Sequence, residues 1–230
     1  QGRRNLEKRK RQKTQRFENK VRKSVGHLIK ASGGKKLVSS GSSHSLGHSG
    51  AVVLGNILHS FAEIRQNGIS GWLTDKGISL EGKTWEDVKD ILFDACQEKV
   101  VGLDETAANQ ALTELLEDMP IEDDESIDGL EATLRHHIDS SEMKEIIDRF
   151  FGVYIFAHLS QNFEEKLEKK YDQEQVDKYM KDIKDQIILD VKEGVRGHDA
   201  SHIDWNGEEG QAFMRDEFEK IIEVFDDDDD

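Results

Sequence analysis

Apolar side chains recur along this chain at intervals of three and four residues, which is the spacing of one face of an α-helix. Near the amino terminus this stripe consists of Phe17, Val21, Val25 and Leu28. Comparable stripes follow within the ranges 52–64, 85–96, 107–119, 143–154, 176–191 and 213–225. Together with a single proline in the whole chain, they argue against a strand-rich fold. The pattern predicts an all-α protein with a single compact multi-helix domain.

Several helix boundaries can also be predicted from the sequence. Asn67 and Gly68 are expected to end the helix that begins near residue 52. Thr84 and Asp87 have the spacing of a capping box, in which each residue's side chain bonds the other's backbone amide. Asp104 is placed to cap the next helix, which contains closely spaced alanines. The densest apolar group is expected at the core: Met143, Ile146, Ile147, Phe150, Phe151 and Tyr154.

The composition divides the chain into four parts. Residues 1–30 form a basic arm, which we expect to be helical only in its second half because the first half lacks an apolar stripe. Residues 31–50 are rich in Ser, Gly and His and are expected to be a flexible linker. The helical domain is predicted over 51–225, and five aspartates form an acidic tail at 226–230.

The charge is distributed unevenly between these parts. The chain has 230 residues and a net charge of −16, yet its first 36 residues carry 14 Lys/Arg and two Glu, a net charge of +12. The remaining residues therefore carry −28. The arm can be attracted to phosphates, to an acidic partner or to the protein's own acidic body, and the charge alone leaves these alternatives open. The residues expected to contact a partner are Arg9, Arg11, Arg16, Arg22 and Lys23.

The expected location is the cytoplasm, without a membrane span. No apolar stretch approaches the roughly 20 residues that cross a bilayer. The first residues lack the apolar run of a secretory signal, and the single cysteine, Cys96, excludes an internal disulfide.

Two features of the sequence are candidates for a metal site or a catalytic nucleophile. His198, Asp199, His202 and Asp204 are suitable ligand types for a transition metal, but their spacing is unspecific, and a polar capping loop is the favoured interpretation. Cys96 lies at the end of an apolar helix and has no identifiable base, which favours a buried structural thiol over a nucleophile. No catalytic residue, metal or cofactor is therefore assigned.

Nucleic-acid binding is the alternative interpretation of the basic arm. A dozen cations could release counterions from a phosphate backbone. The charge of −28 on the body opposes this, because it repels DNA and competes for the arm. Phe17 is the only aromatic residue in the arm that could stack on a base.

Three segments carry a family resemblance: RFENKVRKSVGHLIKASGG, GWLTDKGISLEGKTWEDVKDILFDA and LDETAANQALTELLEDM. Together they resemble QatB, the small non-ATPase component of the four-gene Qat antiphage defence system of bacteria. The resemblance extends from about Arg16 to Met119. The small, apolar and acidic positions of the family pattern correspond to Leu73, Leu80, Gly82, Asp104, Glu105, Ala108 and Ala111.

The resemblance implies a non-enzymatic accessory protein that acts beside an ATPase, a QueC-like enzyme and a TatD-like nuclease. It further implies that the QueC-like enzyme, whose relatives make 7-deazaguanine nucleobases, modifies the amino-terminal glycine of its partner. This sequence starts at Gln1, and Gly2 is not a glycine exposed by removal of an initiator methionine. Either the modified terminus lies upstream of Gln1, or the modification does not apply to this chain, and no modified residue is assigned.

Overall fold

The computed structural model describes residues 21–30, 46–99, 102–119, 140–194 and 203–226, together with positions 12, 19, 129, 131, 132 and 135. Every regular element in this part of the chain is an α-helix, so the predicted all-α class is confirmed. The segment 21–30, called the arm helix below, comes first. The elements that follow are α3 (His48–Asp75), α4 (Trp85–Cys96), α5 (Leu103–Glu117), α7 (Ser140–Glu168), α8 (Gln173–Gly194) and α9 (Glu208–Asp226).

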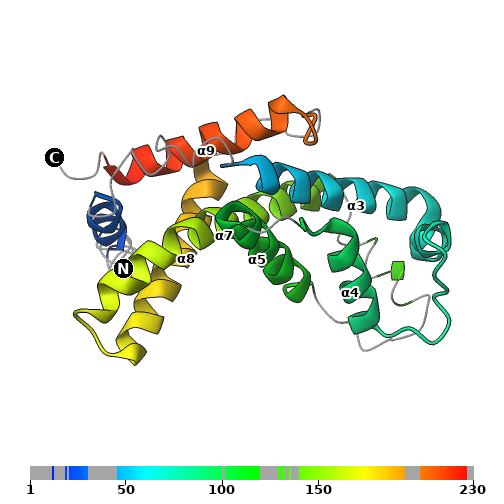
Figure 1. Cartoon of the computed structure of the whole chain (residues 1–230), viewed down its shortest axis with the longest axis horizontal. Helices are drawn as coiled ribbons and strands as arrows, with labels where there is room; N and C mark the ends of the chain where they lie inside the picture. The colour runs from blue at the N-terminus through cyan, green and yellow to red at the C-terminus, as the bar shows by residue number, and fades with distance from the viewer. Residues whose placement is uncertain are drawn as a thin grey trace, which may run out of the picture.

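Helix α7 packs most extensively against α8, and next most extensively against α5. As Figure 1 shows, α7 and α8 lie side by side as a hairpin, α5 packs against α7, and α3 continues the layer toward α4. Helix α9 runs along one side of the molecule, where it contacts both α3 and α8. The arm helix lies near the end of α9, so that the first and last described helices meet (Figure 1).

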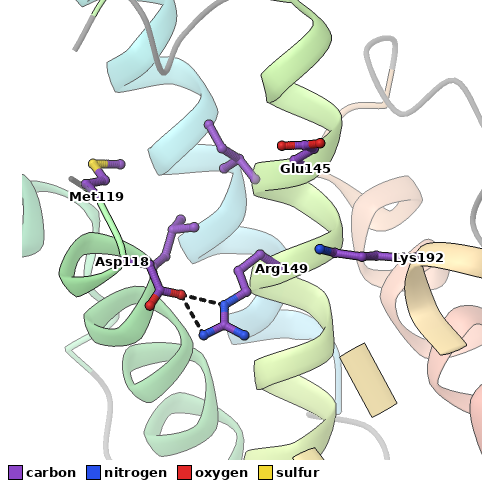
Figure 2. A pocket seen from close by; sticks show the side chains of 7 residues that line it. Asp118, Met119, Glu145, Arg149 and Lys192 are labelled. Atoms are coloured by element: carbon purple, nitrogen blue, oxygen red, sulfur yellow. Dashed lines mark hydrogen bonds and ion pairs between the residues drawn. The ribbon is translucent and has the colours of Figure 1, made fainter. Parts of the chain in front are cut away.

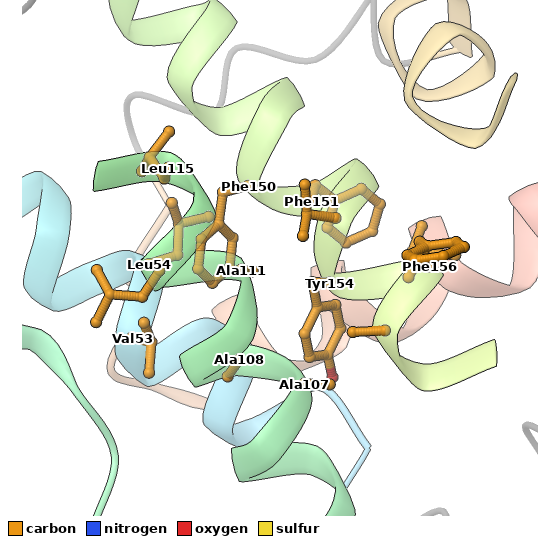
Figure 3. Close-up of a cluster of buried hydrophobic side chains, with 14 of the residues drawn as sticks. Val53, Leu54, Ala107, Ala108, Ala111, Leu115, Phe150, Phe151, Tyr154 and Phe156 are labelled. Carbon is orange, nitrogen blue, oxygen red and sulfur yellow. The ribbon is translucent and has the colours of Figure 1, made fainter. Parts of the chain in front are cut away.

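The core forms where α3, α5 and α7 meet, and Figure 3 shows this cluster. Helix α5 presents Ala107, Ala108 and Ala111, whose small side chains let α7 approach closely. Of the six residues predicted at the core, Met143 lies outside the side chains that the structure describes, and the other five are buried, with Phe150 and Tyr154 at 0% exposure. Aromatic side chains are large, so each one that is buried removes much apolar surface from water and stabilises the core.

Helix α3 has a kink at Gly68, where the backbone adopts φ 72° and ψ 164°. A positive φ is readily adopted by glycine, which lacks a Cβ. The helical stretch predicted from residue 52 therefore ends at Gly68 as expected, and a second short stretch runs on to Asp75. The capping box of Thr84 and Asp87 is also confirmed, with both reciprocal bonds present.

Three sequence predictions need correction. Helix α3 begins at His48, so the last residues of the predicted linker are already helical, while 31–45 lie outside the described residues. Asp104 does not cap its own helix, since the cap position of α5 is Gly102 and no side chain caps it. Within the apolar stripe predicted over 176–191, Tyr179 is 37% exposed, because the buried face of α8 follows Val176, Ile183 and Ile187.

Within the described residues, no helix is both long enough and apolar enough to cross a membrane.

Candidate functional site

The arm helix packs on the body through the apolar stripe seen in its sequence. Val21, Val25 and Ile29 are buried, and their spacing of four residues places them on one face. The opposite face is exposed and carries Lys23, together with two further polar residues, His27 and Lys30. The arm helix is thus part of the hydrophobic core on one side and a basic surface on the other.

Gly26 brings the arm helix into very close contact with the carboxyl-terminal end of α9. A Cβ atom at this position would lie 2.4 Å from the backbone oxygen of Phe225. Backbone cannot move aside as a flexible side chain can, so only glycine fits at this crossing. Gly26 therefore determines how closely the arm helix can approach α9.

Arg22 connects the arm helix to α8 by a buried charge pair. Its guanidinium donates a hydrogen bond to Asp190 Oδ1, which also accepts one from Gln186 Nε2 at 3.0 Å. Asp190 is 4% exposed, and its second oxygen, Oδ2, is buried with no hydrogen-bond partner. Burial raises the pKa of Asp190, and the Arg22 charge only partly offsets this increase. Arg22 thus compensates a carboxylate that the body alone leaves under-bonded.

The point at which the linker joins the body is held by Asp104. Helix α3 begins after Gly47, whose backbone is left-handed (φ 86°), and no side chain of that segment caps it. Asp104 instead accepts hydrogen bonds from the backbone N–H groups of Gly47, at 3.2 Å, and Ser49, at 2.7 Å. A carboxylate at the amino end of a helix bonds free amides and complements the helix dipole. Asp104 of α5 therefore caps α3.

Two side chains of α7 complete this site, and Asp104, Tyr154 and His158 are called the anchor cluster below. The Tyr154 hydroxyl donates to Asp104 Oδ1, and His158 Nε2 lies 2.9 Å from the same oxygen. Burial would raise the pKa of Asp104, but hydrogen bonds from His158, Tyr154 and the Ser49 amide outweigh it and hold the pKa below its ordinary value. Burial and the neighbouring Asp104 charge raise the pKa of Tyr154 well above its ordinary value. Asp104 is therefore an anion that four donors surround.

The anchor cluster holds the chain in place and does not face a substrate. Tyr154 is fully buried, Asp104 is 3% exposed and His158 is 8% exposed. The His158 ring is further covered by Phe218, with ring centres 5.6 Å apart and planes at 88°. A catalytic group needs access to the reacting atom, and the cluster is closed.

A pocket of about 400 Å³ lies among the ends of α5, α7 and α8 (Figure 2). Arg149 forms an ion pair with Asp118 at the wall of this pocket, in which its Nε and Nη2 atoms each lie 2.6 Å from Asp118 Oδ2. Glu145 and Lys192 add one further charge of each sign, and the remaining wall is apolar. The two cations and two anions of the pocket balance one another, and no His, Cys, Ser or Thr is among the described residues that line it, so we assign no ligand to the pocket.

Of the five predicted partner-contacting residues, the structure describes two. Arg22 is turned toward Asp190, whereas Lys23 is exposed on the same helix. Arg9, Arg11 and Arg16 lie outside the described residues, so their role stays a prediction.

The predicted metal candidates His198 and His202 also lie outside the described residues. Among the residues that are described, no group of three or more His, Cys, Asp or Glu could hold a metal. Asp204 organises a turn instead: its side chain accepts from the Asn206 amide at 3.3 Å, and its carbonyl accepts from the Gly207 and Gly210 amides. For Asp204 this matches the favoured interpretation of a polar capping loop.

Two functional residues were missed from the sequence. Asp190 interrupts the buried stripe of α8 between Ile187 and Val191, and a carboxylate at such a position indicates a buried charge pair. His158 of α7 is buried and bonded to Asp104 of α5. Nothing local in the sequence connects His158 to Asp104, since these two residues are 54 positions apart.

The model of the protein family described as "Qat anti-phage system associated protein QatB" matches residues 33–225 of this chain. No curated protein matches this chain, and no solved structure does. The matched range contains the anchor cluster and Asp190 but not the arm helix.

Proposed function

This chain belongs to the QatB family of Qat anti-phage system associated proteins, and on that premise we propose that it presents its amino-terminal segment to a QueC-like enzyme. Membership makes it an accessory component of an antiphage defence system, which works together with other components of that system. The finer proposal is that the protein is a non-enzymatic, cytoplasmic partner and the substrate of modification at its amino terminus. An ATPase and a TatD-like nuclease of the same system are further proposed partners.

The observation that carries this proposal is the way in which the arm helix is held. One end of the arm is attached to the body by the Arg22–Asp190 pair and by the close contact of Gly26 with Phe225. Val21, the first residue of the arm helix, is therefore held at a defined place on the body. A segment that begins at a defined point and continues away from it can be offered to an enzyme, whereas a buried terminus cannot.

Charge supports an acidic surface as the docking partner of the arm. Lys23 is exposed beside the attachment point, and the residues before Val21 carry nine Lys/Arg and two Glu. Complementary charge accelerates encounter and excludes wrong partners more than it raises final affinity. The partner's contacting surface should therefore be acidic, and the association should weaken with salt.

The direct test is the intact mass of the full-length protein, purified from cells with and without the QueC-like enzyme. We expect an added mass of the size of a nucleobase, located at the amino terminus, only when the enzyme is present. A catalytically inactive variant of the enzyme is the matched control. An unchanged mass in all samples would remove the substrate role, while co-purification would still be able to support a purely adaptor role.

Co-purification tests the accessory role separately. The chain is co-expressed with the QueC-like enzyme and the ATPase and is purified at moderate salt. We expect it to retain at least one of them. Absence of both from the purified sample would contradict partnership with these two components.

The second candidate is a nucleic-acid-binding role for the arm, which the exposed Lys23 and the charge of residues 1–20 favour. Binding to single- and double-stranded DNA is measured across a salt series. A steep salt dependence that vanishes on deletion of residues 3–23 would support it. No binding at low salt would remove it.

A further inference from the structure

A second pocket, of about 350 Å³, is lined by residues of α5, α7 and α8. It is called the acidic groove below. Its apolar wall includes Phe156, Met180 and Leu103, and the Leu103 side chain is 49% exposed. A leucine that exposed at the mouth of a groove is an apolar contact point that no described residue covers.

The charges that line the groove all have one sign. Glu164 of α7 and Asp177 of α8 are exposed at its rim, and no Lys or Arg is among the described residues that line it. Lys184 approaches the Phe156 ring, with 5.8 Å between its ammonium and the ring centre, but it is paired with Glu114. The groove therefore suits a basic segment that also carries an apolar side chain.

The basic arm could supply such a segment, because the arm helix is attached to α8, which also lines the groove. Arg22 is bound to Asp190 of α8, and Met180 lies ten positions earlier on α8, about 15 Å along its axis. Twenty residues precede Val21, enough to reach about 30 Å as a helix and up to roughly 70 Å when extended. They carry nine Lys/Arg and two Glu, with Leu6 among the basic residues as an apolar anchor. Length, starting point and charge all permit the contact.

We propose that residues 3–20 of this chain dock in its own acidic groove, with cations at Glu164 and Asp177 and an apolar residue against Leu103 and Met180. The docked arm neutralises part of the charge of the body and keeps the amino-terminal segment from non-specific polyanions. A partner that takes the arm must then supply a more acidic surface than the groove. This inference concerns a contact within the chain and holds whether or not a QueC-like enzyme is the partner.

Limited trypsin digestion of the full chain tests the docking, because the arm offers many cleavage sites that a docked segment protects. The variant E164K/D177K reverses the charge of the rim. The matched control is E81K/D90K, which reverses two exposed charges, one in the turn before α4 and one on α4. In low salt we expect cleavage within residues 3–20 to be about fivefold faster in E164K/D177K than in the wild type, as loss of two surface charge pairs implies. The control variant should match the wild type, and high salt should remove the difference.

Two results would overturn the proposal. The first is equal cleavage rates for E164K/D177K and the control. The second is protection that grows with protein concentration, which would place the arm of a second copy in the groove. A carbodiimide cross-link between Lys8, Lys10 or Lys13 and Glu164 or Asp177, recovered from the monomer, gives an independent readout. Mixing isotope-labelled and unlabelled chains shows whether that link is within one chain, as we expect, or between two.

Discussion

Arg22 and Asp190 are 168 positions apart in the chain, yet the guanidinium of the first is hydrogen-bonded to the carboxylate of the second. Asp190 is almost fully buried, so it needs a counter-charge, while Arg22 keeps 27% of its side chain exposed. One of the cations of the basic arm is thereby a structural residue. The arm is divided at this point into a part that belongs to the body and a part that precedes it.

Replacing Arg22 by Ala should destabilise the arm helix, because Asp190 would remain buried without its cation. We expect a loss of about 2 kcal/mol at neutral pH, measured by urea unfolding and by faster amide exchange over 21–30. The loss should shrink as the pH falls, since the pKa of Asp190 is raised and its protonation removes the uncompensated charge. Lys23→Ala, an exposed change on the same helix, is the control and should cost little. Equal effects of both variants would contradict a specific pair.

Replacing Gly26 by Val should push the arm helix away from α9. The new Cβ would meet the Phe225 backbone oxygen at 2.4 Å, and overpacking of this kind costs about 1–3 kcal/mol. Amide exchange over 21–30 measures the displacement. Lys23→Val introduces the same β-branched residue at an exposed position and serves as the control for helix propensity. Normal protection of 21–30 in Gly26→Val would show that the contact with α9 is not needed.

Replacing Asp104 by Asn should weaken the attachment of the α3 amino terminus. Asn accepts fewer hydrogen bonds and carries no charge to pair with His158, so we expect a loss of about 3 kcal/mol at neutral pH in urea unfolding. The folded-state pKa of Asp104 is lowered, so its stabilisation is present above its unfolded-state pKa and is lost as the pH falls through the folded-state value. The difference between the wild type and the variant should therefore shrink in acid. A difference that is independent of pH would contradict an ionised Asp104.

Tyr154→Phe isolates one donor of the same cluster. Asp104 would keep its two backbone donors and His158, so the expected loss is about 1 kcal/mol, clearly smaller than for Asp104→Asn. The two variants are compared by urea unfolding at one pH. An equal or larger loss for Tyr154→Phe would mean that the hydroxyl, and not the carboxylate, is the centre of the cluster.

Cys96 should react slowly with thiol reagents in the folded protein. Burial raises the pKa of its thiol to about 11, so little thiolate is present at neutral pH. Its sulfur lies 3.6 Å from Ser60 Oγ, inside the core. We expect Ellman's reagent to label the single cysteine rapidly only after denaturation. Rapid labelling of the native protein would show that Cys96 becomes accessible.

Local features of the sequence could predict most of the helices. The capping box at Thr84 and the helix end at Gly68 depend on residues a few positions apart, and both were predicted correctly. The buried face of the arm helix was predicted in part: Val21 and Val25 are buried as expected, whereas Ile29 is fully buried and the predicted Leu28 only partly so. Each prediction needed only the chemistry of neighbouring residues and the period of the helix.

The candidate site could not be predicted in the same way. Asp104 has the position of a residue that caps its own helix, yet it bonds Gly47 and Ser49 of another. Arg22 has the sequence context of an exposed cation, yet its partner is Asp190. In both cases the residue type indicated a charged hydrogen-bonding group correctly, and the partner was wrong or unknown.

The helical class of this chain, the acidic character of its body and the basic character of its arm all follow from the order of its residues. That Asp104 of α5 holds the start of α3, and that Asp190 of α8 accepts a hydrogen bond from Arg22, became visible once the helices were seen packed together. The physical reason is that helical period and capping are set by neighbours within a few residues. The partner of a buried charge depends on which helices pack together, and that depends on the whole chain.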